Sequence, residues 1–331
     1  MLDSHVLGSG LTVLRRTLLA CLTSFILLGT STGVVLAEAA PAAASDTIEV
    51  PGGRIRMTVR GGEVSPAERT RFMEWIRRSA TIVSSYYGRF PVADAEVRVF
   101  PQSGNGVGRG NSVRDVTGLV RVWVGEGSSE AMLKDDWVLV HEMIHLALPN
   151  LDERHAWLSE GLAVYVEGVA RAHAGNRDET DVWREWMQKM PMGLPAAGDE
   201  GLDHTHTWGR TYWGGALFCL LADVGIRQRT QGRKGLQDAM TAVAAKSRGD
   251  GSTWPIEKVL QVADDATGTT VLADLYRNMK DKPTSTDLDA LWSRLGVHRA
   301  GTAIEFDNSA PQADIRRRIM TPRSTLAASR H

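Results

Sequence analysis

The sequence predicts an α+β fold, in which a small N-terminal α/β portion with an edge strand packs on a mainly helical C-terminal portion. Two observations predict it. Segments with the alternating pattern of strands are concentrated before residue 128, and nearly all later apolar segments have the spacing of helices. The composition is typical of a globular protein, since 43% of the 331 residues are hydrophobic and 23% are charged.

We predict four parts along the chain: a signal peptide over 1–39, an α/β subdomain over 40–128, a helical subdomain over 129–300 and a C-terminal tail over 301–331. No clear linker separates the second part from the third.

Residues 1–39 have the pattern of an export signal. Arg15 and Arg16 precede a long apolar stretch that ends in VLAEAA, which offers small residues at cleavage spacing. We therefore expect a periplasmic or extracellular protein. An uncleaved segment would instead anchor the chain through residues 17–37, because about twenty residues can span a bilayer. After cleavage Cys219 is the one thiol, and its apolar surroundings predict a buried, inert side chain.

The N-terminal portion reads as strands around one helix. Two short strands flank the turn signal Pro51-Gly52-Gly53. The capping box Ser65-Pro66-Ala67-Glu68 opens a helix that runs to about Tyr87. Residues 95–100 and 119–124 alternate as strands do, and the glycine-rich segment GNGVGRGNS between them predicts a loop.

The later part reads as a succession of helices. We expect the first over about 129–148 and the second over about 158–174, and IEFDN near residue 305 predicts a late strand. Further helices are predicted at DVWREWMQKM, TYWGGALFCLLADVGIRQ, LQDAMTAVAAKS, IEKVLQVA, TVLADLYRNM and LDALWSRLG. The basic run 316–318 predicts a solvated helix face, and the net charge of −1 argues against nucleic-acid binding.

A metal site is indicated by the stretch HEMIH. On a helix, His141 and His145 lie one turn apart on the same face and can bind one ion. Glu142 projects beside that ion, where a general base can take a proton from a metal-activated water. A catalytic zinc needs three protein ligands and one open position. The third ligand is expected from the next helix.

The stretch WLSEGLAVY, residues 157–165, supplies a candidate and a resemblance. Together with HEMIH it resembles the gluzincin metallopeptidases, above all the aminopeptidases of the leukotriene-hydrolase type and the glycyl aminopeptidases. Those families carry HExxH followed by W-x-x-E-G-x-A/T-x-Y. The resemblance implies a zincin-like fold with one zinc ion held by His141, His145 and Glu160 and with Glu142 as base. It also implies hydrolysis of peptide bonds in a peptide or protein substrate.

Other ligands are weighed against Glu160. His155, Asp152 and Glu153 lie between the second histidine and Glu160. The two acids are expected to begin the next helix, where they suit its dipole, and His155 is expected at the surface or near the ligands. The metzincin pattern fails, because its glycine and histidine positions are leucines here.

Three acids could orient a ligand histidine through a hydrogen bond. Glu167 lies two turns after Glu160 on the same helix face, and Asp135 and Asp136 precede His141. The simpler interpretation of all three is a solvated helix face.

A donor for the developing oxyanion is also expected opposite the metal. TYWGGAL resembles the Y-x-x-G segment of those aminopeptidases, which implies this role for Tyr212. The alternative is a tyrosine packed at a helix start. His204 and His206 could line the same cleft, and the tryptophans after residue 157 could shape it, although ordinary core is the default interpretation.

Substrate would pair with an edge strand, and LVRVWV (119–124) stands at the right place before the metal helix. The G-x-M-E-N segment that holds a free amino terminus in the leukotriene-hydrolase type is missing, and Glu126 is at best a weak substitute. Exopeptidase specificity therefore does not carry over. The alternative function is a catalytically inactive, zincin-like peptide-binding protein. A membrane partner is expected only if the N-terminal segment is not cleaved.

Overall fold

The computed structural model describes residues 46–115, 117–248 and 251–323, which all belong to one compact unit. The predicted signal peptide lies outside these residues. Within them, no helix combines the length and the apolar character needed to cross a membrane.

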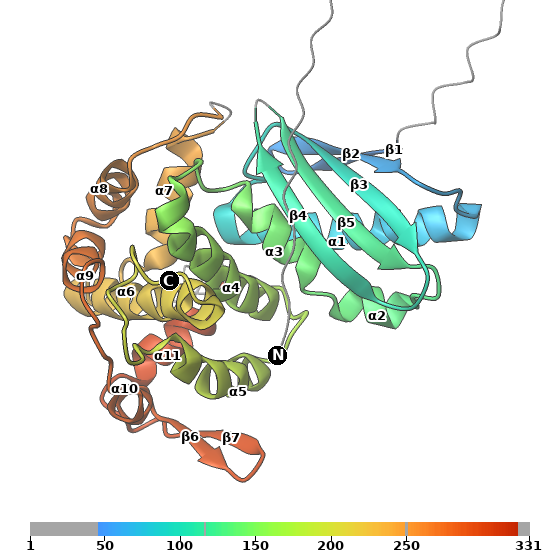
Figure 1. Cartoon of the computed structure of the whole chain (residues 1–331). Coiled ribbons are helices and arrows are strands. Elements are labelled where there is room, and N and C mark those ends of the chain that lie inside the picture. Colours follow the sequence, from blue (N-terminus) through green and yellow to red (C-terminus); the bar gives the residue numbers. More distant parts are fainter. Residues whose placement is uncertain (1–45, 116, 249–250, 324–331) are drawn as a thin grey trace, which may run out of the picture. The chain divides into compact units, whose positions relative to one another are not determined.

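A five-stranded sheet forms the N-terminal part, in the order β1-β2-β3-β5-β4 (Figure 1). The central strands β2 (Gly53–Val59), β3 (Asp94–Gln102) and β5 (Gly118–Gly125) run parallel. The two outer strands, β1 (Asp46–Val50) and β4 (Val107–Arg114), are antiparallel to their neighbours.

One face of this sheet is buried and the other is partly exposed, as alternating strands predict. The helix α1 (Pro66–Tyr87) packs behind the buried face, with its predicted capping box at Ser65 and Gly88 at its end. The apolar side chains of α1 and of the sheet share one core with the later helices; they include Ile48, Ile55, Met57, Phe72, Trp75, Ile76, Val97, Val99, Val120 and Val122.

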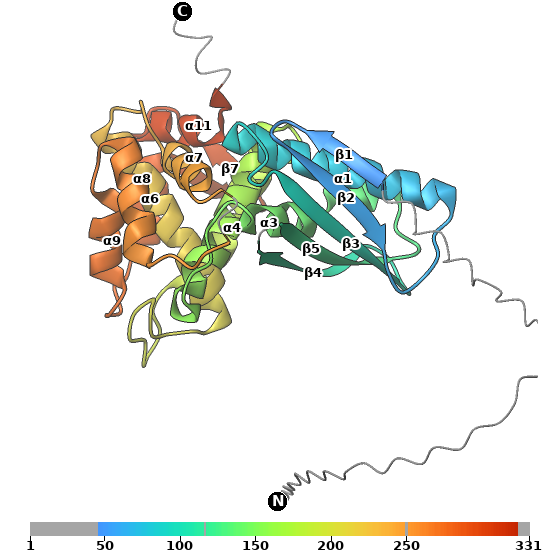
Figure 2. The same ribbon diagram turned by 90° about the horizontal axis from the view of Figure 1, so that it is seen from above.

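The remainder is mainly helical, and Figure 2 shows these helices beside the sheet. Its helices are α2 (Glu130–Asp135), α3 (Val138–His145), α4 (Ala156–His173), α5 (Glu179–Lys189), α6 (Gly215–Arg229), α7 (Leu236–Lys246), α8 (Ile256–Thr267), α9 (Val271–Met279), α10 (Leu288–Leu295) and α11 (Ala313–Met320). Shorter helical turns are η1 (Glu153–His155), η2 (Met190–Gly193) and the π-helical η3 (Gly209–Gly214), and a hairpin joins β6 (Val297–Ala300) to β7 (Ala303–Phe306). The predicted fold class is confirmed.

The prediction of a loop for the glycine-rich segment is wrong, because this segment forms most of the edge strand β4. It pairs with β5 from Val107 to Arg114, with a bulge near Gly108. A Cβ atom at Gly110 would lie 2.6 Å from Cγ of Glu142. Glycine is therefore needed here for a close approach to α3, and its presence does not mark a turn.

The edge strand itself was also placed wrongly. Residues 119–124 belong to β5, which lies between β3 and β4 and has no free edge. The strand at the open edge next to α3 is β4.

The helix predicted over 129–148 is two helices, because the chain is extended at Asp136. Its carboxylate accepts hydrogen bonds from the backbone N–H of Val138 at 2.9 Å and of Leu139 at 3.0 Å, and from the indole of Trp75 at 3.1 Å. These bonds cap the start of α3 and stop α2.

The segment predicted as a tail carries β7 and α11. The solvated face predicted for 316–318 is wrong for Arg316, which is 2% exposed. Its guanidinium donates to the carbonyl oxygens of Leu295 at 3.0 Å and Gly296 at 2.7 Å. The buried thiol predicted at Cys219 is confirmed at 1% exposure.

Candidate metal centre

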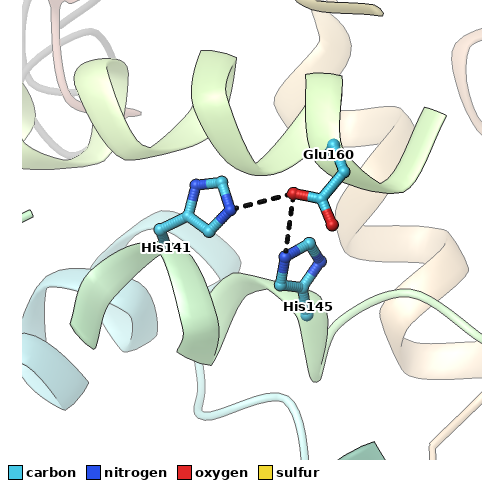
Figure 3. Close-up of side chains that lie close together, drawn as sticks. All are labelled: His141, His145 and Glu160. Carbon is cyan, nitrogen blue, oxygen red and sulfur yellow. Dashed lines mark hydrogen bonds and ion pairs between the residues drawn. The ribbon is translucent and has the colours of Figure 1, made fainter. Parts of the chain in front are cut away.

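Two histidines and one glutamate converge between α3 and α4 (Figure 3). The Oε2 atom of Glu160 lies 3.2 Å from Nε2 of His141 and 3.6 Å from Nε2 of His145. In the described part of the chain these three residues form the only group whose donor atoms all lie within 4.8 Å of one another.

The donor set fits zinc. Zinc takes imidazole nitrogen and carboxylate oxygen, and ligand atoms about 2.0–2.1 Å from a tetrahedral ion stand about 3.3 Å apart. The two separations from Glu160 are close to that value. His145 uses its other nitrogen, Nδ1, for a hydrogen bond to Oγ of Ser159 at 3.0 Å, which leaves Nε2 facing the centre. Ser159 was not predicted as a site residue, although it directly precedes Glu160.

The start of α4 is held by a buried polar cluster. His155 is 2% exposed, and its Nδ1 lies 3.1 Å from Oδ1 of Asp203. The same carboxylate accepts hydrogen bonds from the indole of Trp157 at 2.8 Å and the hydroxyl of Tyr276 at 2.7 Å. His155 is thus neither at the surface nor in the metal cluster. The buried polar cluster around Asp203 fixes the first turn of α4, from which Glu160 projects.

The other alternative ligands also lie apart from the cluster. Asp152 caps η1 by accepting from the backbone N–H of Arg154 at 3.2 Å, and Glu153 belongs to that short turn. Neither is grouped with His141 and His145.

The charges within the cluster depend on one another. Burial opposes ionisation of Glu160, but hydrogen bonds from both histidines outweigh burial and hold its pKa well below its usual value. Burial likewise disfavours the charged form of His145, yet its bond to Glu160 raises its pKa overall. The site is therefore a preformed pairing of one carboxylate with two imidazoles.

Glu142 lies beside this cluster and is 7% exposed. Burial raises its pKa above the usual value, against the opposing effects of His145, His141 and a hydrogen bond with Ser112 of β4. The carboxylate is thus held between the metal-side histidines and the edge strand.

Tyr212 reaches the site from η3, and close helix packing puts it there. Gly161, on α4, and Gly215, at the start of α6, lie so close that a Cβ atom on either would overlap the backbone of the other helix, including the carbonyl of Trp157. Gly161, the residue next to Glu160, therefore contacts the start of α6, which directly follows the turn η3 that carries Tyr212.

The ring of Tyr212 stacks on Trp208 at 5.7 Å and lies 6.4 Å from the ring of His141. The pKa of Tyr212 is raised to about 12, first by burial and then by the charge of Glu160, a hydrogen bond to Glu160 and the charge of Glu142. The hydroxyl is therefore a hydrogen-bond donor near neutral pH.

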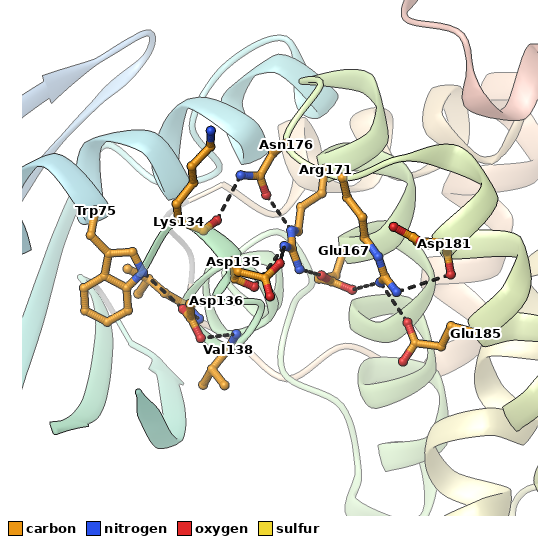
Figure 4. Close-up of polar contacts among 12 residues, drawn as sticks. Trp75, Lys134, Asp135, Asp136, Val138, Glu167, Arg171, Asn176, Asp181 and Glu185 are labelled. Atoms are coloured by element: carbon orange, nitrogen blue, oxygen red, sulfur yellow. Dashed lines mark hydrogen bonds and ion pairs between the residues drawn. The ribbon is translucent and has the colours of Figure 1, made fainter. Parts of the chain in front are cut away.

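The three acids considered as partners of a ligand histidine bind elsewhere (Figure 4). Glu167 is buried and accepts from Arg171 at 2.7 Å, and Arg171 also donates to the carbonyl oxygen of Asp135 at 3.0 Å. Asp136 caps α3. In the described part of the chain, the hydrogen bonds and ion pairs of these three acids go to residues other than His141 and His145. The prediction of a solvated helix face is also wrong for Glu167 and Asp136, which are not exposed.

A cavity of about 650 Å³ opens over the cluster, between β4 and the start of α4. Glu142, Glu160 and Tyr212 line it, but His204 and His206 do not. His204 instead pairs with Asp281 at 2.9 Å on the surface. A second cavity of about 780 Å³ is lined by Trp208 and Trp213, whereas Trp183 and Trp186 belong to the core.

No protein-family model and no curated protein matches the sequence. Among solved structures, an aminopeptidase N family protein from Idiomarina loihiensis is similar, with a TM-score of 0.58 and 14% identity over 77% of this chain. An M1 zinc metallopeptidase from Deinococcus radiodurans aligns over 74% of this chain at 16% identity, with a TM-score of 0.48. The alignments cover 49% and 53% of those chains, so this chain spans about half their length. The first similarity shows a shared fold.

Proposed function

We propose that the protein is a zinc-dependent peptidase of the gluzincin type with a single metal ion. The observation that carries this proposal is the convergence of His141, His145 and Glu160 in an open cavity, with Glu142 beside them. The fold shared with an aminopeptidase N family protein supports it.

In this proposal the two histidines and Glu160 hold the zinc. When bound, zinc supplies a Lewis acid that polarises the substrate carbonyl and activates a water molecule. Glu142 accepts a proton from the attacking water at its carboxylate and delivers it to the leaving amine. The edge strand and α3 keep that carboxylate next to the cavity.

Tyr212 donates a hydrogen bond from its hydroxyl to the oxyanion that develops on the substrate carbonyl. Such a donor must be held in place before the reaction, because reorganising it during the reaction would cost free energy and reduce the stabilisation of the transition state. Stacking on Trp208 and the close packing of α4 on α6 support this role.

The free edge of β4 is the proposed binding site for substrate backbone. A peptide adds to such an edge as an extra strand through main-chain hydrogen bonds. This requires no particular substrate sequence, and it would bring the scissile bond next to the metal ligands, with Glu142 beside the attacking water.

The test is zinc content and peptide hydrolysis, measured on residues 40–331 at matched free zinc. We expect close to one zinc per chain in the wild type and a clear loss in Glu160→Ala. Glu142→Gln should retain zinc and lose hydrolysis. Zinc fully retained in Glu160→Ala would refute the assigned ligand, and wild-type protein that binds zinc and peptides without cleavage would favour the inactive alternative.

A further inference from the structure

The cavity over the metal cluster is elongated along β4. Its lining includes Gly108 and Arg109 at one end of the strand and Arg114 at the other, where Asn150 and Asp152 also contribute. Six residue steps of strand correspond to about 20 Å. The cavity therefore follows a length of edge strand that can pair with several residues of a peptide.

Glu142 faces the middle of this stretch. Gly110 approaches its Cγ atom so closely that an added Cβ would lie at 2.6 Å, and Ser112 forms a hydrogen bond with its carboxylate. Two residues of β4 that line the cavity, Gly108 and Arg109, precede this point, and Arg114 follows it. A peptide paired with β4 would thus have strand on both sides of the general base, although at the far end the carbonyl oxygen of Arg114 already accepts from the amide of Asn150 at 3.0 Å.

The second cavity continues the space beyond the cluster. It shares Trp137, His141 and Tyr212 with the first cavity and is not lined by Glu142 or Glu160. Trp137 and Trp208, which line it, are 52% and 58% exposed. Exposed indole rings beside a cavity offer contact area for bulky apolar side chains of a bound peptide.

The carboxylates of the second cavity are already engaged, as Figure 4 shows for several of them. Glu167 pairs with Arg171 at 2.7 Å, and Glu185 pairs with Arg177 at 2.8 Å and with Lys189 at 2.7 Å. Asp135 and Asp181 also pair with arginines, and Asp178 caps α5. Each of these carboxylates is thus partly neutralised by a cation of the chain or used as a helix cap, which weakens its attraction for a free amino terminus.

The first cavity offers no better place for an amino terminus. Among the described residues, its carboxylates are Glu142, Glu160 and Asp152. The first two belong to the reaction, and the side chain of Asp152 is 62% exposed and lies 3.6 Å from Arg154. Glu126, the weak substitute considered from the sequence, lines neither cavity.

We propose that the enzyme is an endopeptidase, which binds chain on both sides of the scissile bond and requires neither free terminus. This inference rests on the proposed zinc peptidase function. It assigns the substrate class as unfolded or extended polypeptide segments that can pair with β4.

The test uses a diverse set of synthetic peptides, each prepared with free termini and with an acetylated amino end and an amidated carboxyl end. Zinc-loaded residues 40–331 are incubated with both forms, Glu142→Gln serves as control, and products are identified by mass spectrometry. We expect the same internal bonds to be cut in both forms at similar kcat/KM.

The outcomes separate this inference from the function beneath it. Stepwise loss of terminal residues from the free form alone would overturn the endopeptidase assignment and leave the peptidase function standing. No cleavage of either form by zinc-loaded protein would overturn both.

Two variants at opposite ends of the cavity give an independent readout. Arg109→Ala and Asp152→Asn, which keeps the side-chain oxygen that caps η1, should each raise KM for long internal substrates several-fold, because the bound peptide contacts both ends. Arg77→Ala, on α1 and outside both cavities, is the matched control. A response at one end alone would contradict the proposal.

Discussion

At the residue scale, Ser159 contacts His145, one of the proposed metal ligands. Its hydroxyl lies 3.0 Å from Nδ1 of His145, and this hydrogen bond leaves Nε2 directed at the cluster. Partners of this kind typically contribute ten- to hundredfold to metal affinity. Loss of the hydroxyl should therefore weaken zinc binding without removing a ligand.

We predict that Ser159→Ala binds zinc roughly tenfold more weakly than the wild type, whereas Ser159→Thr, which keeps the hydroxyl, restores most of the affinity. Competition with a zinc chelator measures both constants. Equal affinity of the wild type and Ser159→Ala would show that the hydrogen bond does not orient His145.

A second residue-scale effect concerns Glu96 on β3, far from the metal cluster. The guanidinium of Arg98 donates to it at 2.8 Å and Thr58 donates at 2.8 Å, and despite burial these bonds lower its pKa to about 2. A carboxylate with a lowered pKa stabilises the fold above the pKa of the unfolded chain. That contribution is lost as the pH falls through the folded value.

Glu96→Gln should therefore lower the free energy of unfolding by about 1 kcal/mol at pH 7, and the difference should shrink between pH 4.5 and pH 2. Thermal unfolding over this pH range measures it. Glu305→Gln, at an exposed position of β7, is the control. A difference that does not change with pH would contradict the assignment.

At the element scale, the crossing of α4 and α6 decides where Tyr212 stands. The backbones of Gly161 and Gly215 touch, so that any side chain must separate the helices. Overpacking of a close contact typically costs about 1–3 kcal/mol. Separation would also carry Tyr212 away from Glu160.

We expect Gly215→Ala to destabilise the protein by about 2 kcal/mol or more and to lower kcat of the folded fraction. Gly225→Ala, on the same helix, is the matched control, because its Cβ would meet only the side chain of Val271, at 3.0 Å. Chemical denaturation and steady-state kinetics report the two effects. A Gly215→Ala protein as stable as Gly225→Ala would refute the tight crossing.

Local signals in the sequence were sufficient for some elements and insufficient for others. The capping box at Ser65 and the terminal Gly88 correctly bounded α1, because caps are local. The break at Asp136 combines a local cap of Val138 and Leu139, which was missed, with a hydrogen bond from Trp75, which is distant in sequence. The strand β4 has the composition of a loop, and only the approach of α3 explains Gly110.

The candidate site likewise has features that could be predicted from the sequence and features that could not. The grouping of His141, His145 and Glu160 could be predicted, since the first two share a helix turn and the third belongs to a motif. The buried environment of His155 could not, because Asp203 and Tyr276 come from distant segments. The edge strand beside Glu142 was likewise misplaced, because sheet order is set by pairing across the whole sheet.

At the scale of the whole molecule, the proposed metal ion would join α4 to α3, the helix that packs against the edge strand β4. A ligand that binds only the folded chain stabilises it, by about 2.7 kcal/mol when its free concentration is a hundred times the Kd. For a chain of this size, an unfolding entropy of roughly 2 cal/mol/K per residue means that each kcal/mol raises Tm by about 1.5 °C.

We therefore predict that saturating zinc raises the Tm of the wild type by roughly 4–6 °C over chelator-treated protein. Glu160→Ala should show only a small rise at the same free zinc, because the carboxylate that links α4 to the two histidines of α3 is missing. Glu142→Gln should rise about as far as the wild type, since it keeps all three ligands. Differential scanning calorimetry at fixed free zinc measures all three. An equal rise in Glu160→Ala and the wild type would place the stabilising ion elsewhere and would separate the stability of the fold from the metal centre.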